Sequence, residues 1–262
     1  MGRSQWYPVI AVALLAAGIA AGCETVPYTG RSQLQLMSPE QESQLGAQAF
    51  QQTLAKAKLS SDAGASEMVT RVGSRIAAVT GHPEYKWEYR LIQDDKQANA
   101  FALPGGKVAV YTGILPITRD ENGLAAVLGH EIGHVVARHG GERISQQMLV
   151  NVGLETTMAA LSRGNPATVQ AVASLLGAGA TVGVLLPWSR AQESEADHLG
   201  LILMAKAGYD PHAARDLWVR MAAASQGSGK PPEFLSTHPS EPTRIKQIEG
   251  WMPEAMQSYH PR

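Results

Sequence analysis

The sequence has very little cysteine and almost no net charge, and both scarcities limit what the protein can be. Its 262 residues include one cysteine, so an internal disulfide cannot form. The 22 lysine and arginine residues nearly balance the 23 aspartate and glutamate residues, which leaves a formal net charge of -1. Such a chain provides no positive field for holding a phosphate backbone. We therefore expect no nucleic-acid partner.

Aromatic residues are also few, at 6% of the chain, but hydrophobic residues as a class make up 44%. A chain of this length buries roughly 70 to 75% of the surface that its unfolded form exposes. It can therefore build an enzyme-sized core without disulfides, in one domain or at most two.

The first 22 residues read as an export signal rather than as part of the fold. Arg3 supplies a positive start, Val9 to Ile19 is an apolar run, and Ala-Ala-Gly leads directly into Cys23. A cysteine in this place resembles a bacterial lipobox, in which the chain is cut before Cys23 and the thiol carries a lipid. An ordinary signal or an N-terminal anchor with an incidental cysteine is the alternative.

The lipidated interpretation predicts a location as well as an anchor. Residues 24–36 are turn-rich and polar, so residues 23–37 are expected to form a tether between the lipid and a domain spanning residues 38–262. In Gram-negative lipoproteins a residue other than aspartate after the cysteine implies sorting to the outer membrane, and Glu24 meets that condition. We expect a periplasmic protein, held by its lipid at the inner face of the outer membrane.

The mature chain reads as mostly helical α+β, with one small sheet. Helices are expected over residues 38–58 and 68–79, strands over 85–91, 99–103 and 107–111, and helices throughout the chain after residue 120, with a break at Gly140-Gly141. The last two strands flank Pro104-Gly105-Gly106, which predicts a hairpin.

The clearest chemical motif is His130-Glu131-Ile132-Gly133-His134, within an apolar helical pattern. Four residues advance about 400° around a helix, so the two imidazoles project side by side and can bind one ion. Glu131 can reach a water on that ion without being a ligand. Without an ion, these groups on an apolar helix would be costly unpaired polar groups.

A catalytic zinc ion takes three protein ligands and keeps a fourth position open, so a third ligand must come from elsewhere. The spacing of a metzincin is absent, because His139 lies one residue out of register; a role at the helix end is its expected function. Glu193 and Asp197 are i, i+4 neighbours, so one can bind the ion while the other anchors an imidazole N–H. Glu195 is about 200° from Glu193 and is expected to be solvated.

The segments HEIGHVVARH, SRAQESEAD and STHP, in this order, resemble the M48 family of zinc metallopeptidases. This gluzincin group includes HtpX, the CAAX prenyl proteases and Oma-like enzymes, and the resemblance is closest to a bacterial periplasmic lipoprotein branch. It covers roughly residues 30–249 and implies a zincin-like domain with the small sheet beside the HEXXH helix.

The resemblance also implies roles for individual residues. It makes His130, His134 and Glu193 the ligands of one zinc ion per chain, Glu131 the general base and Asp197 the second acid. His238, in the STHP segment, corresponds to a histidine near the metal, which implies either oxyanion stabilisation or a removable fourth ligand.

The strand before the hairpin turn is expected to be functional. It resembles the family's active-site strand, whose free edge pairs with an extended substrate backbone; the residues concerned are Asn99, Ala100, Phe101 and Ala102. The alternative is a hairpin that only covers the core.

Residues 164–189 carry no charged side chain, and by length they could cross a bilayer. We expect instead a buried or groove-lining helix pair near the metal, because the zinc ligands must share one compartment with their base.

These observations predict a zinc-dependent endopeptidase that acts on misfolded or mis-assembled envelope proteins. The substrate class comes from the resemblance alone. The alternative is an envelope assembly factor or chaperone with a largely structural zinc site, although a structural site needs no general base such as Glu131.

Overall fold

The computed structural model describes residues 23–27, 29–161, 189–227, 232–238 and 243–261, which fall into two compact units. The smaller unit comprises residues 1–38 and 141–184, and the larger unit residues 39–140 and 185–262. The expected signal, the side chain of Cys23 and nearly all of the uncharged stretch 164–189 lie outside the described residues. The division of the chain at residues 22 and 37 therefore stays a prediction.

The smaller unit contains a hairpin where we expected an irregular tether. Strand β1 (Cys23–Thr25) pairs antiparallel with β2 (Ser32–Leu34), so the chain has a second sheet that sequence patterning missed. The reason is that the buried residue of β2 is polar: Gln33 is 4% exposed. The alternation of apolar and polar residues that predicts a strand is therefore absent.

Helix α6 (His139–Leu161) runs through the rest of the described part of this unit. The Arg31 guanidinium donates two hydrogen bonds of 2.7 Å to the Glu142 carboxylate, and the Leu36 N–H donates to Ser145 Oγ at 2.9 Å. A bidentate ion pair fixes direction as well as distance, so it orients the hairpin on the helix. None of the described helices is long and apolar enough to span a bilayer.

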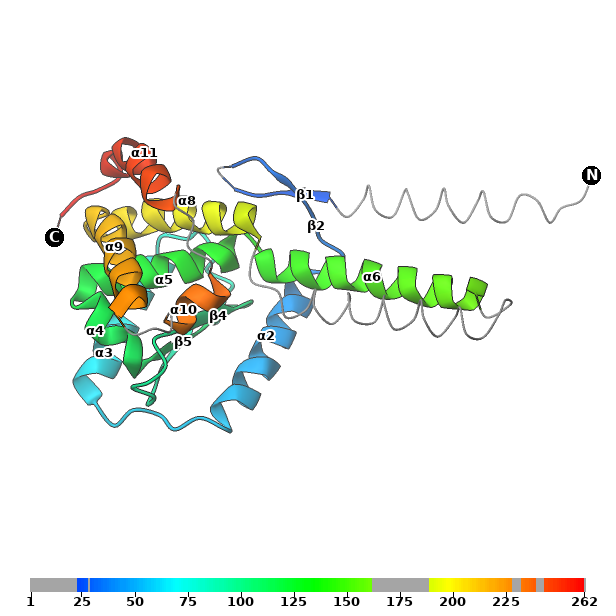
Figure 1. Cartoon of the computed structure of the whole chain (residues 1–262), viewed down its shortest axis with the longest axis horizontal. Coiled ribbons are helices and arrows are strands. Elements are labelled where there is room, and N and C mark those ends of the chain that lie inside the picture. The colour runs from blue at the N-terminus through cyan, green and yellow to red at the C-terminus, as the bar shows by residue number, and fades with distance from the viewer. Residues whose placement is uncertain (1–22, 28, 162–188, 228–231, 239–242, 262) are drawn as a thin grey trace, which may run out of the picture. The chain divides into compact units, whose positions relative to one another are not determined.

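The larger unit is mostly helical with one three-stranded sheet, as the sequence predicted (Figure 1). Its elements are α2 (Pro39–Leu54), α3 (Ala63–Ala77), β3 (Glu88–Ile92), β4 (Ala100–Leu103), β5 (Lys107–Tyr111), the 3-10 turn η2 (Thr112–Ile114), α4 (Leu115–Thr118), α5 (Glu121–Val136), α8 (Arg190–Lys206), α9 (His212–Gly227), α10 (Glu233–Thr237) and α11 (Arg244–Gln257).

The sheet has the order β3-β5-β4, with β3 parallel and β4 antiparallel to β5. The predicted hairpin around Pro104 is confirmed. The strand expected from Tyr85 begins only at Glu88, but its predicted alternation holds, since Tyr89 and Leu91 are buried and Arg90 is exposed. Strand β4 lies at one edge of this sheet.

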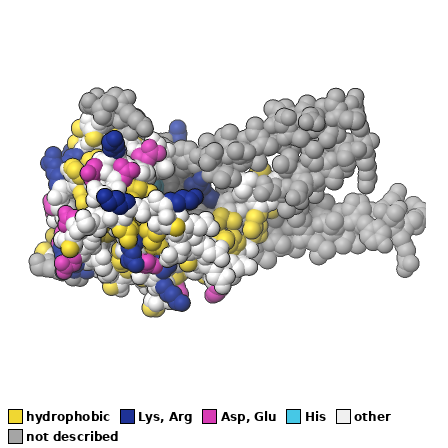
Figure 2. Space-filling view, turned by 90° about the horizontal axis from the view of Figure 1, so that it is seen from below, with side chains coloured by type: hydrophobic (Ala, Val, Ile, Leu, Met, Phe, Trp, Pro, Cys, Tyr) yellow, Lys and Arg dark blue, Asp and Glu magenta, His cyan; other side chains and the backbone are white. Residues whose placement is uncertain are grey.

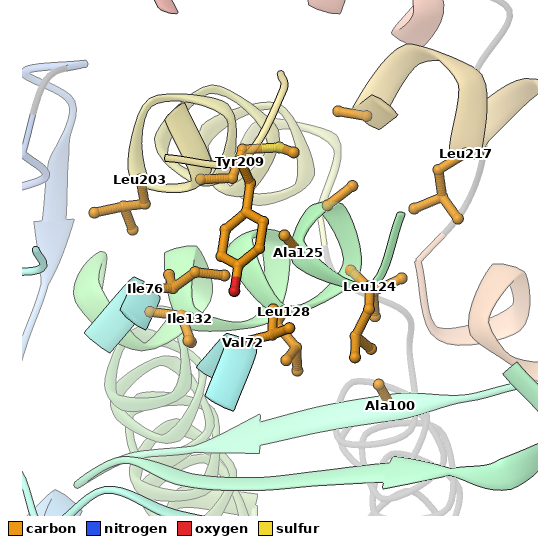
Figure 3. Packing of buried hydrophobic residues seen from close by; sticks show 14 of the residues in the cluster. Val72, Ile76, Ala100, Leu124, Ala125, Leu128, Ile132, Leu203, Tyr209 and Leu217 are labelled. Atoms are coloured by element: carbon orange, nitrogen blue, oxygen red, sulfur yellow. The ribbon is translucent and has the colours of Figure 1, made fainter. Parts of the chain in front are cut away.

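Helix α5 is at the centre of the core. Every residue from Gly123 to Val136 is buried, as expected for a helix that is apolar on all sides. Figure 3 shows α5 between the sheet and α8, with Leu124 and Leu128 pointing toward the strands. Helices α3 and α9 also pack against α5.

Several helix boundaries differ from the predicted ones, and the first helix ends at Leu54 rather than at residue 58. Helix α3 begins at Ala63, five residues before the first apolar position of its pattern, because the Asp62 carboxylate caps it by accepting the Ala65 N–H at 2.9 Å. The break expected at Gly140-Gly141 lies instead at Arg138, whose φ of 56° separates α5 from α6.

The exposed surface carries charges of both signs. On the face seen in Figure 2, basic and acidic side chains are interspersed among hydrophobic ones.

Candidate metal centre

The two histidines of the HEXXH motif lie on one face of α5, as their spacing predicts. Their ring centroids are 4.7 Å apart, and His130 Nε2 lies 3.2 Å from His134 Nε2. The helix is continuous through the motif and begins at a firm cap, because the Asp120 carboxylate accepts the Gly123 N–H at 2.8 Å.

Small residues bring α8 against this helix. A Cβ atom added to Gly129 would lie 2.8 Å from the carbonyl oxygen of Gly200, and one added to Gly133 would lie 2.8 Å from that of Ala196. These distances are shorter than ordinary van der Waals contact, so larger residues would force the helices apart. The backbones of α5 and α8 therefore meet directly, which places the acids of α8 beside the imidazoles of α5.

Glu193 is the carboxylate that reaches both imidazoles. Its Oε1 lies 3.3 Å from His134 Nε2, and its Oε2 lies 3.6 Å from His130 Nε2. Helix α8 begins just before it at Ser189, whose side chain forms a capping box with Gln192.

Asp197 takes the anchoring position on the opposite nitrogen of His130. Its Oδ1 lies 2.8 Å from His130 Nδ1, the ring nitrogen that faces away from Glu193. The sequence left open which of the two acids would bind an ion, and the structure brings Glu193 into the group of candidate ligand atoms. Glu193 faces the Nε2 atoms, whereas Asp197 orients the ring, the arrangement that metal-binding histidines generally use.

Arg244, at the start of α11, is a site residue that the sequence analysis missed. Its side chain is 3% exposed and lies 2.6 Å from Asp197 Oδ2 and 3.0 Å from Glu193 Oε2. The guanidinium carbon lies 3.4 Å from the centre of the Trp218 ring. One buried cation thus holds both acids of α8 and rests on an aromatic face. No local spacing marks it, because its partners are 47 and 51 positions away along the chain.

His238 also enters the cluster. Its Nδ1 lies 2.9 Å from Glu193 Oε1 and 3.0 Å from His130 Nε2. Helix α10 carries it there, since the Phe234 N–H donates to the Ala98 carbonyl at 3.0 Å and the Phe234 ring stacks on His238. The segment before β4 therefore positions the histidine of the STHP motif.

His130, His134, Glu193 and His238 together form a group that can hold a metal ion. One ligand atom from each lies within 4.8 Å of the others, and all four residues are buried. Imidazole nitrogens with one carboxylate suit a transition metal such as zinc.

The charges of the cluster also suit a cation. Glu131, Glu193 and Asp197 are all nearly inaccessible, and the buried guanidinium of Arg244 contacts the last two. Burying charges is expensive unless they are compensated. Three buried carboxyl groups face one guanidinium here, and a divalent ion would offset the negative charge that they carry when ionised.

Glu131 is adjacent to this group but faces the sheet. Its Oε2 accepts the Ala102 N–H at 3.1 Å, and its Oε1 lies 3.2 Å from His238 Nε2. Burial raises the pKa of the Glu131 carboxyl, although His238 and His130 oppose the change. A raised pKa is what a group needs to accept a proton and then release it near neutral pH.

The other shifts follow from the same crowding. Burial lowers the pKa of His134, so its imidazole is neutral and has a lone pair for a metal. Burial alone would raise the pKa of Glu193, but His130, His134 and His238 outweigh it and keep this carboxylate ionised. For His238, burial is outweighed by Glu131 and Glu193, which raise its pKa.

Strand β4 presents part of its backbone to its free edge. The Tyr111 N–H donates to the Asn99 carbonyl at 3.0 Å, so the backbone groups of Asn99 point toward β5. Phe101, two residues further along β4, points its backbone groups the same way. In an antiparallel ladder the intervening residues, Ala100 and Ala102, direct their N–H and C=O groups to the other side. The bond from Ala102 to Glu131 shows that this edge faces the cluster.

One prediction about a neighbouring residue was wrong. Glu195 is not solvated but 5% exposed, because α8 is buried on nearly all sides. His139 lies near the end of α5, as expected; it is fully buried, and its Nδ1 lies 2.8 Å from His134 Nδ1. Its Nε2 lies 3.0 Å from Glu195 Oε2.

Two hollows formed by described residues lie away from the cluster. A hollow of about 520 Å³ is lined by residues of α3 and β3 and their connection, among them Ser74, Trp87 and Tyr89. Another of about 600 Å³ lies beside the end of α2, near Tyr111. Neither is lined by a residue of the cluster.

Comparison with known proteins agrees with this donor set. The sequence profile of Peptidase family M48 matches residues 65–252, which include every residue of the cluster. The chain belongs to this family. Because M48 peptidases depend on a metal, the chain is a metalloendopeptidase, and the group around His130 and His134 is where its metal can bind.

Individual relatives divide between two kinds of protein. The chain is 41% identical to the mitochondrial metalloendopeptidase OMA1 of Schizosaccharomyces pombe, over 97% of this chain and 73% of that protein. It is 31% identical to human OMA1, over 89% of this chain and 46% of that protein. It is also 31% identical to the beta-barrel assembly-enhancing protease of Yersinia pestis, over 90% of this chain and 51% of that protein.

These relatives confirm an Oma-like M48 peptidase, but they leave the bacterial lipoprotein branch a prediction. The chain spans about half the length of the human and Yersinia proteins.

Proposed function

We propose that the protein is a zinc-dependent endopeptidase that cleaves unfolded or mis-assembled proteins of the cell envelope. The observation that carries the chemistry is the convergence of His130, His134 and Glu193 from two helices, with Glu131 adjacent. The family and the donor set support zinc as the metal, one ion per chain.

A zinc ion in this group would lower the pKa of a water molecule to about 7 and polarise the scissile carbonyl. Glu131 accepts the proton of the attacking water and passes it to the leaving amine, and burial raises the pKa of its carboxyl, which favours acceptance of the proton. The Ala102 N–H orients this carboxylate by binding one of its oxygens.

His238 is proposed to act on the developing negative charge of the carbonyl oxygen. Its ring lies against both Glu131 and Glu193, so it is close to the reacting atoms. Because it also belongs to the group of ligand atoms, it is alternatively a fourth ligand that holds the enzyme inactive until it moves away. The variant His238→Ala should change the turnover number while zinc is retained; complete loss of zinc would instead identify an essential ligand.

The free edge of β4 is proposed to bind substrate. Ala100 and Ala102 direct their C=O groups to this edge, beside the general base, while their N–H groups bind Asn99 Oδ1 and Glu131. Strand addition recognises a peptide mainly through its backbone, which suits cleavage of many unfolded sequences. Asn99 and Phe101 support the strand from the β5 side.

An assembly factor with a largely structural zinc site is the second candidate. It is favoured by one name among the relatives, the beta-barrel assembly-enhancing protease, which refers to assembly as well as proteolysis. The buried Glu131 beside the ligands favours catalysis, because a structural site does not need it.

Cleavage of casein or of an unfolded envelope protein separates the two candidates. Zinc-loaded wild type should cleave, whereas Glu131→Gln, which keeps the ligands, should bind zinc and show no cleavage. Equal cleavage by both forms, or none by folded and zinc-loaded wild type, would refute the peptidase mechanism.

The proposed location is the periplasm, with a lipid on Cys23 holding the chain at the inner face of the outer membrane. The sequence before Cys23 supports it, whereas the names of the OMA1 relatives refer to mitochondria. Expressed in a Gram-negative host, the Cys23→Ala variant should move to the soluble periplasmic fraction. Continued pelleting with membranes would contradict acylation.

A further inference from the structure

His139 connects a metal-binding imidazole to a buried acid. Its Nδ1 lies 2.8 Å from His134 Nδ1, and its Nε2 lies 3.0 Å from Glu195 Oε2. All three side chains are almost inaccessible, with exposures of 2%, 0% and 5% for His134, His139 and Glu195. The three groups therefore form a buried chain that leads away from the ligand atoms.

The hydrogen positions in this chain follow from metal binding. His134 Nε2 faces Glu193 and His130, so this nitrogen is the one that offers a lone pair to an ion. The Nδ1 of the same neutral ring then carries the hydrogen and donates it to His139 Nδ1. His139 must in turn carry its own hydrogen on Nε2, where Glu195 accepts it. Every donor in the chain thus faces an acceptor.

The backbone is shaped to make this contact. Arg138 adopts a positive φ of 56° directly after α5, a conformation that is uncommon for residues other than glycine. The turn brings His139, only five positions after His134, back against the same ring. Glu195 comes from α8, the helix that also supplies Glu193, so one helix provides the acid beside His134 Nε2 and the acid beside His139 Nε2.

We propose that His139 and Glu195 are positioning residues that hold His134 in the orientation and tautomer that bind the metal. This role rests on the proposed zinc-dependent function. It is distinct from the anchoring of His130, which Asp197 and Arg244 provide on the other side of the site. Each of the two imidazoles would then have its own buried acid, one in direct contact and one acting through a second histidine.

Zinc affinity of the purified full-length protein tests the proposal, measured by competition with a chromogenic chelator. The variant His139→Leu fills a similar volume but cannot accept the His134 hydrogen, so affinity should fall by about 10- to 100-fold. The variant His139→Asn places an amide oxygen near the position of Nδ1 and should recover a large part of that loss. Glu195→Met should weaken zinc binding by a smaller factor, because the His139 ring remains.

A matched control is present on α8, the helix that carries Glu195. His198 lies 2.7 Å from Glu254, but this pair is partly exposed and does not contact the ligand group. His198→Leu should leave zinc affinity unchanged. Thermal unfolding of the metal-free forms reports packing separately. A purely structural role of His139 would lower the unfolding temperature of both His139→Asn and His139→Leu, but it would not make zinc affinity higher in His139→Asn than in His139→Leu.

Wild-type zinc affinity in His139→Leu would overturn the proposal, as would equal losses in His139→Leu and His139→Asn. If His139→Leu does not fold, wild-type affinity in Glu195→Met overturns it instead. These outcomes differ from failure of the proposed function, in which folded wild type itself binds no zinc or cleaves no substrate.

Discussion

Histidine–carboxylate pairs occur both in the metal centre and on the surface, and they have nearly the same length. The buried pair His130–Asp197 and the exposed pair His212–Asp210 are both 2.8 Å long. The two residues of the first pair have side chains 4% and 3% exposed, whereas those of the second are 59% and 43% exposed. A short contact alone therefore says little about function.

Two properties distinguish the buried pair. Water screens the surface pair, so it contributes little. In the metal centre, losing one partner would leave the other charge buried and uncompensated. The second property is convergence, because His130 also contacts His134 and His238, while His212 contacts the acid two residues before it. Matched substitutions, one in the metal centre and one on the surface, can test this difference.

The largest effect is expected where a ligand itself is removed. Glu193→Ala deletes the only carboxylate in the ligand group, so zinc affinity should fall by more than about 100-fold, beyond the usual loss for a residue that only supports a ligand. Peptide cleavage should be lost with it. Glu254→Ala removes a surface acid from a histidine pair and should change neither quantity. A Glu193→Ala protein with one tightly bound zinc ion would contradict the assigned ligand set.

Arg244 should have the next largest effect, on stability. Arg244→Met leaves Asp197 and Glu193 without their buried cation, at an expected cost of about 3 to 5 kcal/mol in the free energy of unfolding of the metal-free protein. Arg215→Met removes an exposed arginine that also contacts two acids, and denaturant unfolding should not detect it. Equal unfolding midpoints for the two variants would refute the role of burial.

Asp197→Asn tests the direct anchor of His130. The amide keeps the shape but loses the charge, so zinc affinity should fall by about 10- to 100-fold. Asp210→Asn makes the same change in the surface pair and should leave zinc binding unaltered. Wild-type zinc affinity in both variants, measured by chelator competition, would contradict the anchoring role of Asp197.

Gly129→Ala should give the smallest effect, through the spacing of α5 and α8. The added methyl group would meet the Gly200 carbonyl, at an expected cost of about 1 to 3 kcal/mol in the free energy of unfolding. Gly250→Ala in α11 meets no atom within 4 Å and should stabilise the protein by up to about 1 kcal/mol. The two changes should thus shift the unfolding midpoint in opposite directions.

The sequence predicted the parts of this site that depend on local geometry. Helical spacing placed His130 and His134 together, and the turn residues Pro104-Gly105-Gly106 predicted the hairpin that carries Ala102. Spacing also reduced the candidates for the third ligand to Glu193 and Asp197. Choosing between these two acids required the resemblance or the structure, because both lie on the same face of α8.

The remaining parts depend on contacts that join distant positions. Arg244 reaches His130 across 114 positions, and His139 reaches Glu195 across 56. A period of 3.6 residues shows which side chains share a face, but it does not show whether the opposite face meets water or protein. For this reason Glu195 was expected to be solvated. The β1–β2 hairpin was missed for a related cause, because its buried residue is a glutamine.

The glycine contacts between α5 and α8 have a consequence for the stability of the protein with and without its metal. Two of the proposed ligands come from α5 and the third from α8, so a bound ion would join the two helices. Metal binding and the close packing of α5 against α8 would then be coupled. A chain that has lost its ion would lose this packing first, at the position of the active site itself.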